Sequence, residues 1–253
     1  MHAIIAAGGI PQPGEPLYPL TQGQNKALLE IAGKPMIQWV LDAISGSKKI
    51  DCVVVIGLPP SVKLNCKYPI NYLKDHHSMI ENVQAGARAV LKEYPNASKV
   101  LLFSSDIPTI TPKIVDWMVT EVESSDHDLY YSVIERCVME KRFPSSNRTF
   151  IKLKDIQVCG GDMHAVKIQT AIQGNTLYQE IANARKNALK QASLIGWGVV
   201  FLILTRKMTL ADGVRLISKR LGLSGRVIIS PYAEVGMDVD KPVQYKIVKS
   251  DLL

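Results

Sequence analysis

Three short stretches of this chain carry residues that could bind phosphate groups or a metal ion. The first is Ala7-Gly8-Gly9, which ends an apolar run and is followed further along the chain by Lys26. Glycines let backbone N–H groups come close to phosphate oxygens, and a lysine adds positive charge. The combination predicts a phosphate-binding loop, and the alternative is that the glycines only make a tight turn.

The other two stretches contribute carboxylates. Asp106 stands in "SSDIP" at the end of an apolar run, where it could bind a metal ion or only cap a turn. Asp238 and Asp240 stand two residues apart in "GMDVDKP", so in an extended segment both side chains point to the same side. The alternative for this pair is surface polarity ahead of a helix. Magnesium prefers oxygen ligands, so the three aspartates predict a magnesium site if the fold brings them together.

The elements that must position these residues are predicted from the hydrophobic pattern. Short β-branched runs alternate with helical patterns through the first half, which is typical of βαβ units and a parallel sheet. Ligands of such sheets bind beyond the carboxyl ends of the strands, where Gly8, Gly9 and Asp106 all stand. We expect strands over 2–7, 51–57, 70–75 and 99–106, and helices over 35–46, 79–94 and 111–122.

The alternation loosens after residue 127. We expect antiparallel strands over 128–135 and 148–155, amphipathic helices over 177–191 and 210–222, and a late strand over 226–231. We predict one domain over 1–253, in which 1–127 form a nucleotide-binding half and 128–253 an acceptor-side half.

Composition limits the class of protein and of partner. The 253 residues are 47% hydrophobic and 21% charged, which is typical of a folded globular chain. The net charge of +7 favours an anionic partner, but the lysines and arginines are spread along the chain, so we expect no nucleic-acid partner. The four cysteines, Cys52, Cys66, Cys137 and Cys159, are far apart, which favours a reduced protein in the cytoplasm.

One apolar stretch, residues 194–204, is flanked by basic residues. It is too short to cross a bilayer as a helix, which takes about 20 residues. We expect a buried helix here, and the alternative is a helix that lies on a membrane surface.

Three motifs together give the chain a family resemblance. "IIAAGG" with "NKALLEIAGKPMIQWVLDAI", then "SSDIP", then "DVDKPVQYKIV" resemble the nucleotidyltransferases of the GT-A-like fold. The resemblance is to the branch that holds molybdenum-cofactor guanylyltransferases and sugar-phosphate nucleotidyltransferases. It implies an α/β fold of three layers, with a mostly parallel central sheet and a small antiparallel and helical region on the acceptor side.

The resemblance also implies roles for individual residues. Lys26 would neutralise phosphate charge during catalysis, and Asp106 and Asp240, with Asp238 beside them, would bind Mg²⁺. The residues implied for nucleotide binding are Ala7, Gly8, Gly9, Lys26, Asn82 and Ser105. The residues implied for acceptor binding are Gly160, Gly161, Asp162 and His164.

The implied reaction is a magnesium-dependent transfer of NMP from an NTP to a phosphorylated acceptor, with release of pyrophosphate. The acceptor could be a sugar phosphate, a polyol phosphate or a molybdopterin-like compound, and the base of the NTP and the oligomeric state stay open. The alternatives are a glycosyltransferase of the same fold, which uses a nucleotide sugar, and a nucleotide-binding domain without catalysis.

The chain departs from the family pattern at one position. The family's loop carries an arginine shortly after its glycines, whereas this chain has Pro11-Gln12-Pro13 there and no arginine before Arg88. Phosphate binding would then depend on Lys26, on Lys34 or on a basic residue from elsewhere in the chain.

Overall fold

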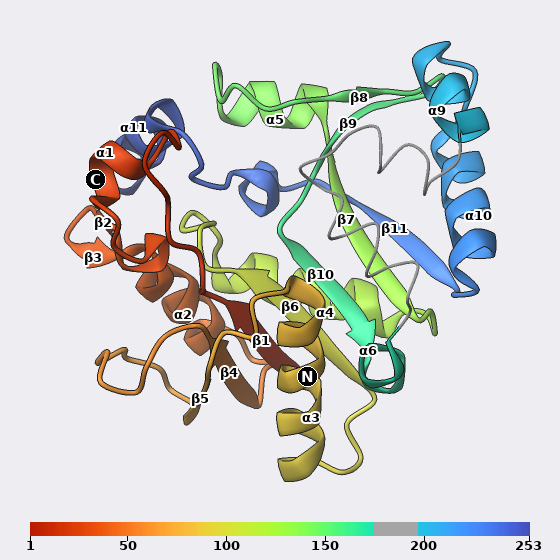
Figure 1. Cartoon of the computed structure of the whole chain (residues 1–253). Coiled ribbons are helices and arrows are strands. Elements are labelled where there is room, and N and C mark those ends of the chain that lie inside the picture. The colour runs from red at the N-terminus through yellow and green to blue at the C-terminus, as the bar shows by residue number, and fades with distance from the viewer. Residues whose placement is uncertain (175–196) are drawn as a thin grey trace.

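A computed structural model, which describes residues 1–174 and 197–253, shows a large mixed sheet with helices on both faces (Figure 1). The strands of this sheet are β1 (His2–Ala6), β4 (Cys52–Ile56), β5 (Ile70–Leu73), β6 (Lys99–Ser104), β7 (Leu129–Glu135), β8 (Ile151–Lys152), β9 (Gln157–Gly160), β10 (Met163–Lys167) and β11 (Gly225–Ser230). Their order is β5-β4-β1-β6-β10-β7-β9-β8, and β11 pairs with β7.

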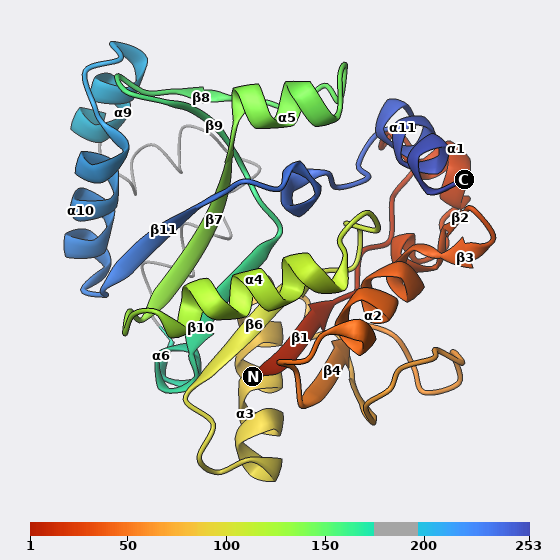
Figure 2. The same cartoon turned by 180° about the vertical axis from the view of Figure 1, so that it is seen from behind.

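Helices cover the two faces of the sheet as separate layers. The covering helices are α2 (Met36–Gly46) and α4 (Pro112–Glu123) on one face, and α3 (Met79–Glu93) and α6 (Ile168–Gln173) on the other. Figure 1 shows α3 and α6 in front of the sheet, and Figure 2, from behind, shows α2 and α4 in front of it. The predicted three-layer α/β architecture is confirmed.

The remaining helices and short strands lie around these layers. They are α1 (Tyr18–Thr21), η1 (Lys26–Leu28), β2 (Glu30–Ile31), β3 (Lys34–Pro35), α5 (Arg136–Arg142), α9 (Trp197–Leu204), α10 (Leu210–Leu221), η3 (Ala233–Gly236) and α11 (Pro242–Leu252).

The central strands form because alternate side chains enter different apolar layers. In β4, Val53 and Val55 pack with the buried residues of α2 and α4, while Val54 and Ile56 pack with those of α3. Strands β5, β4, β1 and β6 run parallel, as predicted for chains that alternate strands with helices. All the strands and helices predicted in the first half are present.

The second half forms a mixed continuation of the same sheet. Strand β10 is antiparallel to both β6 and β7, and β7 is parallel to β11, so the prediction of antiparallel strands there is correct only in part. The strand predicted over 148–155 is shorter, because the hydrogen bond from the N–H of Leu153 to the carbonyl of Ile156 closes a turn after β8. The division into two functional halves stays a prediction.

The prediction of a buried helix over 194–204 is wrong for the part that the structure describes. Helix α9 leaves Phe201 61% and Leu204 76% exposed. The helix contacts β8, the last strand of the sheet, so it lies at the sheet edge and not between two layers. Residues 194–196, like the helix predicted over 177–191, lie outside the described residues. Within the described ranges, no helix combines the length and the apolar character that crossing a membrane requires.

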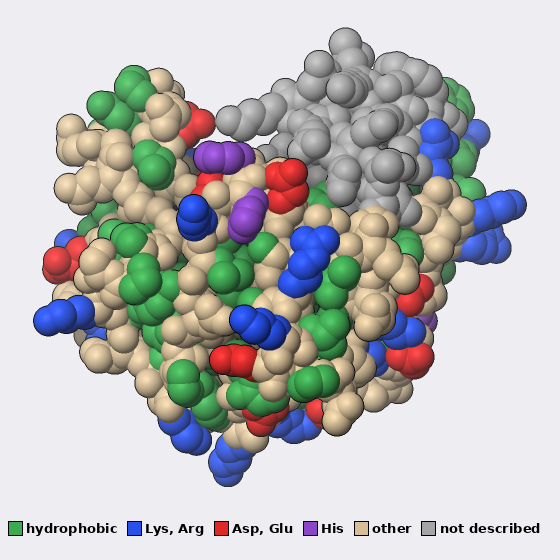
Figure 3. All heavy atoms as spheres, turned by 60° about the horizontal axis from the view of Figure 1, so that its bottom comes forward, with side chains coloured by type: hydrophobic (Ala, Val, Ile, Leu, Met, Phe, Trp, Pro, Cys, Tyr) green, Lys and Arg blue, Asp and Glu red, His purple; other side chains and the backbone are tan. Residues whose placement is uncertain are grey.

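The surface carries charges of both signs. On the face drawn in Figure 3, lysines and arginines alternate with acidic and hydrophobic side chains and form no continuous basic area. The net charge of +7 is therefore dispersed on this face.

Two turns meet backbone to backbone at the end of the central strands. Gly57 follows β4 with a φ of +99°, and a Cβ at this position would overlap the Cα of Gly8. The N–H of Ala7 donates to the carbonyl of Ile56 over 2.8 Å and links the two turns. A side chain at Gly57 would therefore displace the loop after β1.

We predict that Gly57→Ala lowers the free energy of unfolding by about 2 kcal/mol or more, since a strained backbone costs roughly 1–3 kcal/mol and the methyl group also pushes on Gly8. The matched control is Gly33→Ala, because Gly33 has a φ of +79° but open space around it. Its expected loss is about 1 kcal/mol. Urea denaturation measures both, and equal losses would show that the contact with Gly8 has no energetic weight.

Candidate active site

The loop after β1 begins where the order of the parallel strands reverses. Strand β1 lies between β4 and β6, so the chain builds outward on one side and then crosses to the other. Crevices at such switch points are where open α/β sheets bind ligands. Gly8 and Gly9 follow β1 and Asp106 follows β6, so the structure places both predicted stretches at this switch point.

Lys26 is anchored to the glycine loop by its neighbours. Its backbone N–H donates to the carbonyl of Gly9 over 2.8 Å. Asn25 caps the turn, because its side-chain oxygen accepts from the N–H of Ala27, and its amide donates to the carbonyl of Ala7 over 2.7 Å. These hydrogen bonds tie Lys26 to the loop, and Asn25, which makes two of them, is not among the residues predicted from the sequence.

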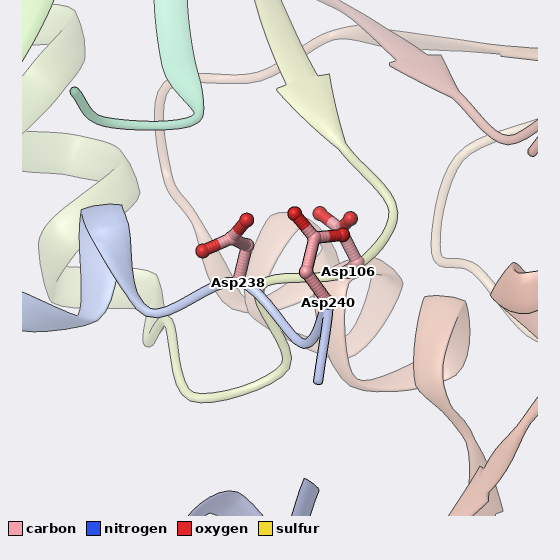
Figure 4. A group of neighbouring side chains, drawn as sticks. All are labelled: Asp106, Asp238 and Asp240. Atoms are coloured by element: carbon pink, nitrogen blue, oxygen red, sulfur yellow. The ribbon is translucent and has the colours of Figure 1, made fainter. Parts of the chain in front are cut away.

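Asp238 and Asp240 are brought to Asp106 by backbone contacts. Val239, which separates them, donates its N–H to the carbonyl of Asp106 over 3.0 Å. The side-chain oxygen of Gln244, in the first turn of α11, accepts from the N–H of Asp240 over 2.9 Å. The alternation around Val239 then directs both carboxylates toward Asp106, as the sequence spacing predicts (Figure 4).

Lys26 bridges two of the three carboxylates. Its ammonium group lies 2.6 Å from Oδ2 of Asp106 and pairs also with Oδ1 of Asp240. Burial by itself would lower the pKa of Lys26, but the charges of Asp106 and Asp240 outweigh burial and raise the pKa above its ordinary value. The lysine therefore carries its full charge in this site.

The three aspartates fit a divalent cation. One carboxyl oxygen from each of Asp106, Asp238 and Asp240 lies within 4.8 Å of the others, and Oδ1 of Asp106 is buried without a hydrogen-bond donor. Oxygen donors of this kind suit Mg²⁺, which also keeps water and phosphate oxygens as ligands. These residues would hold the ion, and Lys26 would then need another anionic partner.

Asp162 and Arg148 complete the charged cluster. Burial raises the pKa of Asp162 to about 7, and the negative charge of Asp106 adds to this shift. Arg148 pairs with Asp238, and its guanidinium lies 4.0 Å from Oδ2 of Asp162. Asp162 is one of the acceptor residues predicted from the sequence. Arg148 is not among the predicted site residues, because it stands in the segment 148–155, whose pattern indicates only a strand.

The other predicted acceptor residues lie beside this cluster, along β9 and β10. Gly160 accepts a hydrogen bond from Arg148 at its carbonyl, and a Cβ on Gly161 would overlap the hydroxyl of Ser132. His164 accepts a hydrogen bond at Nδ1 from the N–H of Ser132 over 3.2 Å. Gly160 therefore lies next to the charged groups, whereas His164 is fixed by the neighbouring strand.

The predicted nucleotide residues Asn82 and Ser105 are both buried. Asn82 donates to Asp75 over 2.7 Å, and the Asp75 carboxyl group packs where a Cβ on Gly8 would lie. Asp75 also lines a cavity of about 490 Å³ that is formed by the segment before α3 and the first turns of that helix. Asn82 therefore orients Asp75, which the sequence analysis missed. Ser105 donates its N–H to the carbonyl of Ala6 and so fixes the start of the Asp106 turn.

Lys34, the other candidate for phosphate binding, pairs with Asp42 over 2.7 Å and lies over the ring of Trp39. These contacts hold it on the β3–α2 side of the glycine loop, and Lys26 is the lysine that reaches the carboxylates.

The fold and the charged cluster define a nucleotidyltransferase-like α/β protein, and comparison with known proteins gives the family. Residues 3–188 match the model of the MobA-like NTP transferase domain, and the chain belongs to this family. The resemblance found in the sequence is thereby confirmed.

The named relatives share about a quarter of their residues with this chain over the aligned parts. The chain is 24% identical over 132 residues to 2-C-methyl-D-erythritol 4-phosphate cytidylyltransferase of Prochlorococcus marinus, covering 50% of this chain and 54% of the relative. It is 23% identical over 103 residues to a probable molybdenum cofactor guanylyltransferase of Pyrococcus horikoshii, covering 41% of this chain and 50% of the relative. The chain thus spans about half the length of the curated relatives it matches.

Two solved structures share the fold. A hypothetical transferase from Thermus thermophilus superposes with a TM-score of 0.83 at 27% identity, covering 96% of this chain and 98% of that one. A CMP:2-keto-3-deoxy-manno-octonic acid synthetase complexed with CTP superposes with a TM-score of 0.57 at 14% identity, covering 99% and 97%. The second likeness concerns the fold alone.

The pH dependence of stability tests the position of His164. Burial lowers the pKa of His164 to about 4, from an ordinary value of 6.5. As pH falls from 6.5 to about 4, the unfolded chain takes up a proton at this side chain and the folded protein does not. The free energy of unfolding therefore falls by up to about 1.4 kcal/mol per pH unit over this range. Above pH 6.5 the side chain is neutral in both states, so it does not change the free energy of unfolding with pH.

We predict that His164→Asn, which keeps an acceptor near Ser132, removes this part of the pH dependence. The measurement is the free energy of unfolding at several pH values for both proteins. Parallel curves between pH 6.5 and 4 would contradict a His164 that stays neutral in the folded protein.

Proposed function

We propose that this protein is a magnesium-dependent nucleotidyltransferase that joins the NMP unit of an NTP to a phosphorylated acceptor. The observation that carries the proposal is the cluster in which Lys26, anchored to the glycine loop, bridges Asp106 and Asp240 at the strand switch point. Family membership supports the proposal, since named relatives are a cytidylyltransferase and a probable guanylyltransferase.

The reaction needs positioning and charge compensation more than covalent chemistry. An oxygen of the acceptor phosphate attacks the α-phosphorus, the new P–O bond forms, and the bond to the β-phosphate oxygen breaks with its electron pair leaving on pyrophosphate. The attacking phosphate is already an anion, so no protein base has to remove a proton. In-line placement and stabilisation of the developing negative charge then supply the catalysis.

Different residues of the chain would bind the triphosphate and the metal ion. The backbone of Gly8 and Gly9 would approach the triphosphate, and Lys26 would exchange its carboxylate partners for phosphate oxygens. Asp106 and Asp240, with Asp238 beside them, would hold Mg²⁺, which supplies Lewis-acid charge compensation at the phosphates. The exchange keeps every charged group paired, because Lys26 gains phosphate as the carboxylates gain the ion.

The experiment that tests the function is a screen for pyrophosphate release. It crosses the four NTPs with sugar, polyol and pterin phosphates, with and without Mg²⁺. The names of the relatives make CTP and GTP the first nucleotides to try. Transfer of a sugar from a nucleotide sugar, or nucleotide binding without turnover, would assign the site to the two alternative classes.

We predict that Lys26→Ala keeps the fold and lowers turnover about a hundredfold or more, since loss of one charged group aimed at a developing anion costs roughly 3 kcal/mol. Lys34→Ala is the matched control, because Lys34 pairs with the exposed Asp42 outside the cluster. Steady-state kinetics on the folded proteins measure both, and equal turnover of Lys26→Ala and wild type would remove Lys26 from the mechanism.

A second prediction concerns metal and nucleotide together. Mg²⁺ with NTP should raise the melting temperature more than the sum of either alone, because Lys26 holds Asp106 and Asp240 until phosphate draws it away. Asp106→Asn and Asp240→Asn should each abolish this synergy, and Asp238→Asn should reduce it less completely. Asp42→Asn is the control outside the cluster. Synergy that survives in both Asp106→Asn and Asp240→Asn would place the metal elsewhere.

A further inference from the structure

Arg148 is a second cation in the cluster, and it approaches from a different side than Lys26. It pairs with Asp238, donates to the carbonyl of Gly160 over 3.1 Å and lies near Asp162. Lys26 in contrast is tied to Gly9 and to the carboxylates of Asp106 and Asp240. The carboxylates therefore separate a lysine on the glycine-loop side from an arginine on the β9 side.

The guanidinium of Arg148 has binding capacity that its present contacts do not use. Its side chain is only 14% exposed, and its Nε–H is buried without a hydrogen-bond acceptor. A guanidinium offers five N–H donors in a planar fork, and a buried donor without an acceptor is costly. An anion with several oxygens would satisfy this donor once the guanidinium turns from its present contacts, and phosphate is the best-matched such anion.

The geometry of the reaction indicates whether Arg148 would bind a phosphate of the NTP or the phosphate of the acceptor. In-line displacement at the α-phosphorus places the attacking oxygen opposite the leaving pyrophosphate. If the glycine loop and Lys26 hold the β- and γ-phosphates, the attacking group enters from the far side of the carboxylates, where Arg148 lies.

We infer that Arg148 binds the phosphate group of the acceptor. The inference rests on the proposed nucleotidyl transfer. Without substrates Arg148 compensates the charge of Asp238, and in the reacting complex Asp238 turns toward the other carboxylates and the guanidinium fork toward the incoming phosphate. The residue thus limits acceptors to compounds that carry a phosphate group.

The test uses inorganic phosphate as the probe of the acceptor site. Wild-type protein is first saturated with Mg²⁺ and an NTP analogue with a methylene group between the α- and β-phosphorus, so that no transfer occurs. Phosphate is then titrated by calorimetry into wild type, Arg148→Gln, Arg148→Lys and the control Arg136→Gln. Arg136 is a matched control because it pairs with Glu140 on α5, away from the carboxylates.

We expect phosphate to bind wild type and Arg136→Gln equally and to bind Arg148→Gln at least tenfold more weakly. Arg148→Lys keeps the charge beside Asp238 and so protects the fold, but it should bind phosphate severalfold more weakly because the fork is lost. Thermal stabilisation by Mg²⁺ and the analogue should stay present in all four proteins.

The outcomes separate the two proposals. Phosphate binding that is absent from wild type, or equal in wild type and in folded Arg148→Gln and Arg148→Lys, overturns the role of Arg148 alone. Phosphate that binds only by displacing the nucleotide analogue overturns it as well. Failure of Mg²⁺ with the analogue to stabilise wild type overturns the proposed function, and the Arg148 inference with it.

Discussion

Repulsion between carboxylates at one edge of the sheet is the constraint on which the rest of this structure depends. Asp106, Asp162, Asp238 and the more exposed Asp240 converge there, and burial makes ionisation costly at Asp162, whose pKa it raises to about 7. Lys26 and Arg148 offset this cost from two sides, which explains why both are 14% exposed although their charges favour water. Removing either cation would leave a buried, unpaired charge.

The surrounding elements hold these charges in place by backbone contacts. The glycine loop fixes Lys26 through the carbonyl of Gly9, and Val239 joins the late segment to the carbonyl of Asp106. Helix α11 lies against β2, where the hydroxyl of Tyr245 donates to the carbonyl of Glu30 over 3.1 Å. The C-terminal helix is thereby docked on the segment that follows Lys26, so residues from both ends of the chain share one rigid frame.

The sequence predicts the parallel half of the fold well, because strands such as β4 are apolar throughout and the helices between them are amphipathic with clear ends. It also offers Lys26, Asp106 and Asp240 as candidates through three separate motifs, and the fold brings these three side chains together. It misses Arg148 and Asp75, whose importance comes only from long-range contacts with Asp238 and Gly8. Helix α9 is misjudged for the same reason, because apolar composition does not tell whether another layer covers a helix at the sheet edge.

The pairing of charges also constrains how substrates can enter. Lys26 cannot neutralise Asp106 and Asp240 while it binds phosphate, and a metal ion cannot take those oxygens while Lys26 holds them. In the proposed reaction, metal alone or nucleotide alone would leave some of these charges unpaired, whereas the two together would pair them again, so we expect the site to bind a metal-bound nucleotide as a unit. If Arg148 binds the acceptor as we infer, an incoming phosphate would likewise replace Asp238 as the partner of its guanidinium. In the proposed reaction, binding would thus be an exchange of partners among charges that, apart from that of the exposed Asp240, are already largely removed from water, which would lower the cost of bringing further anions into the site.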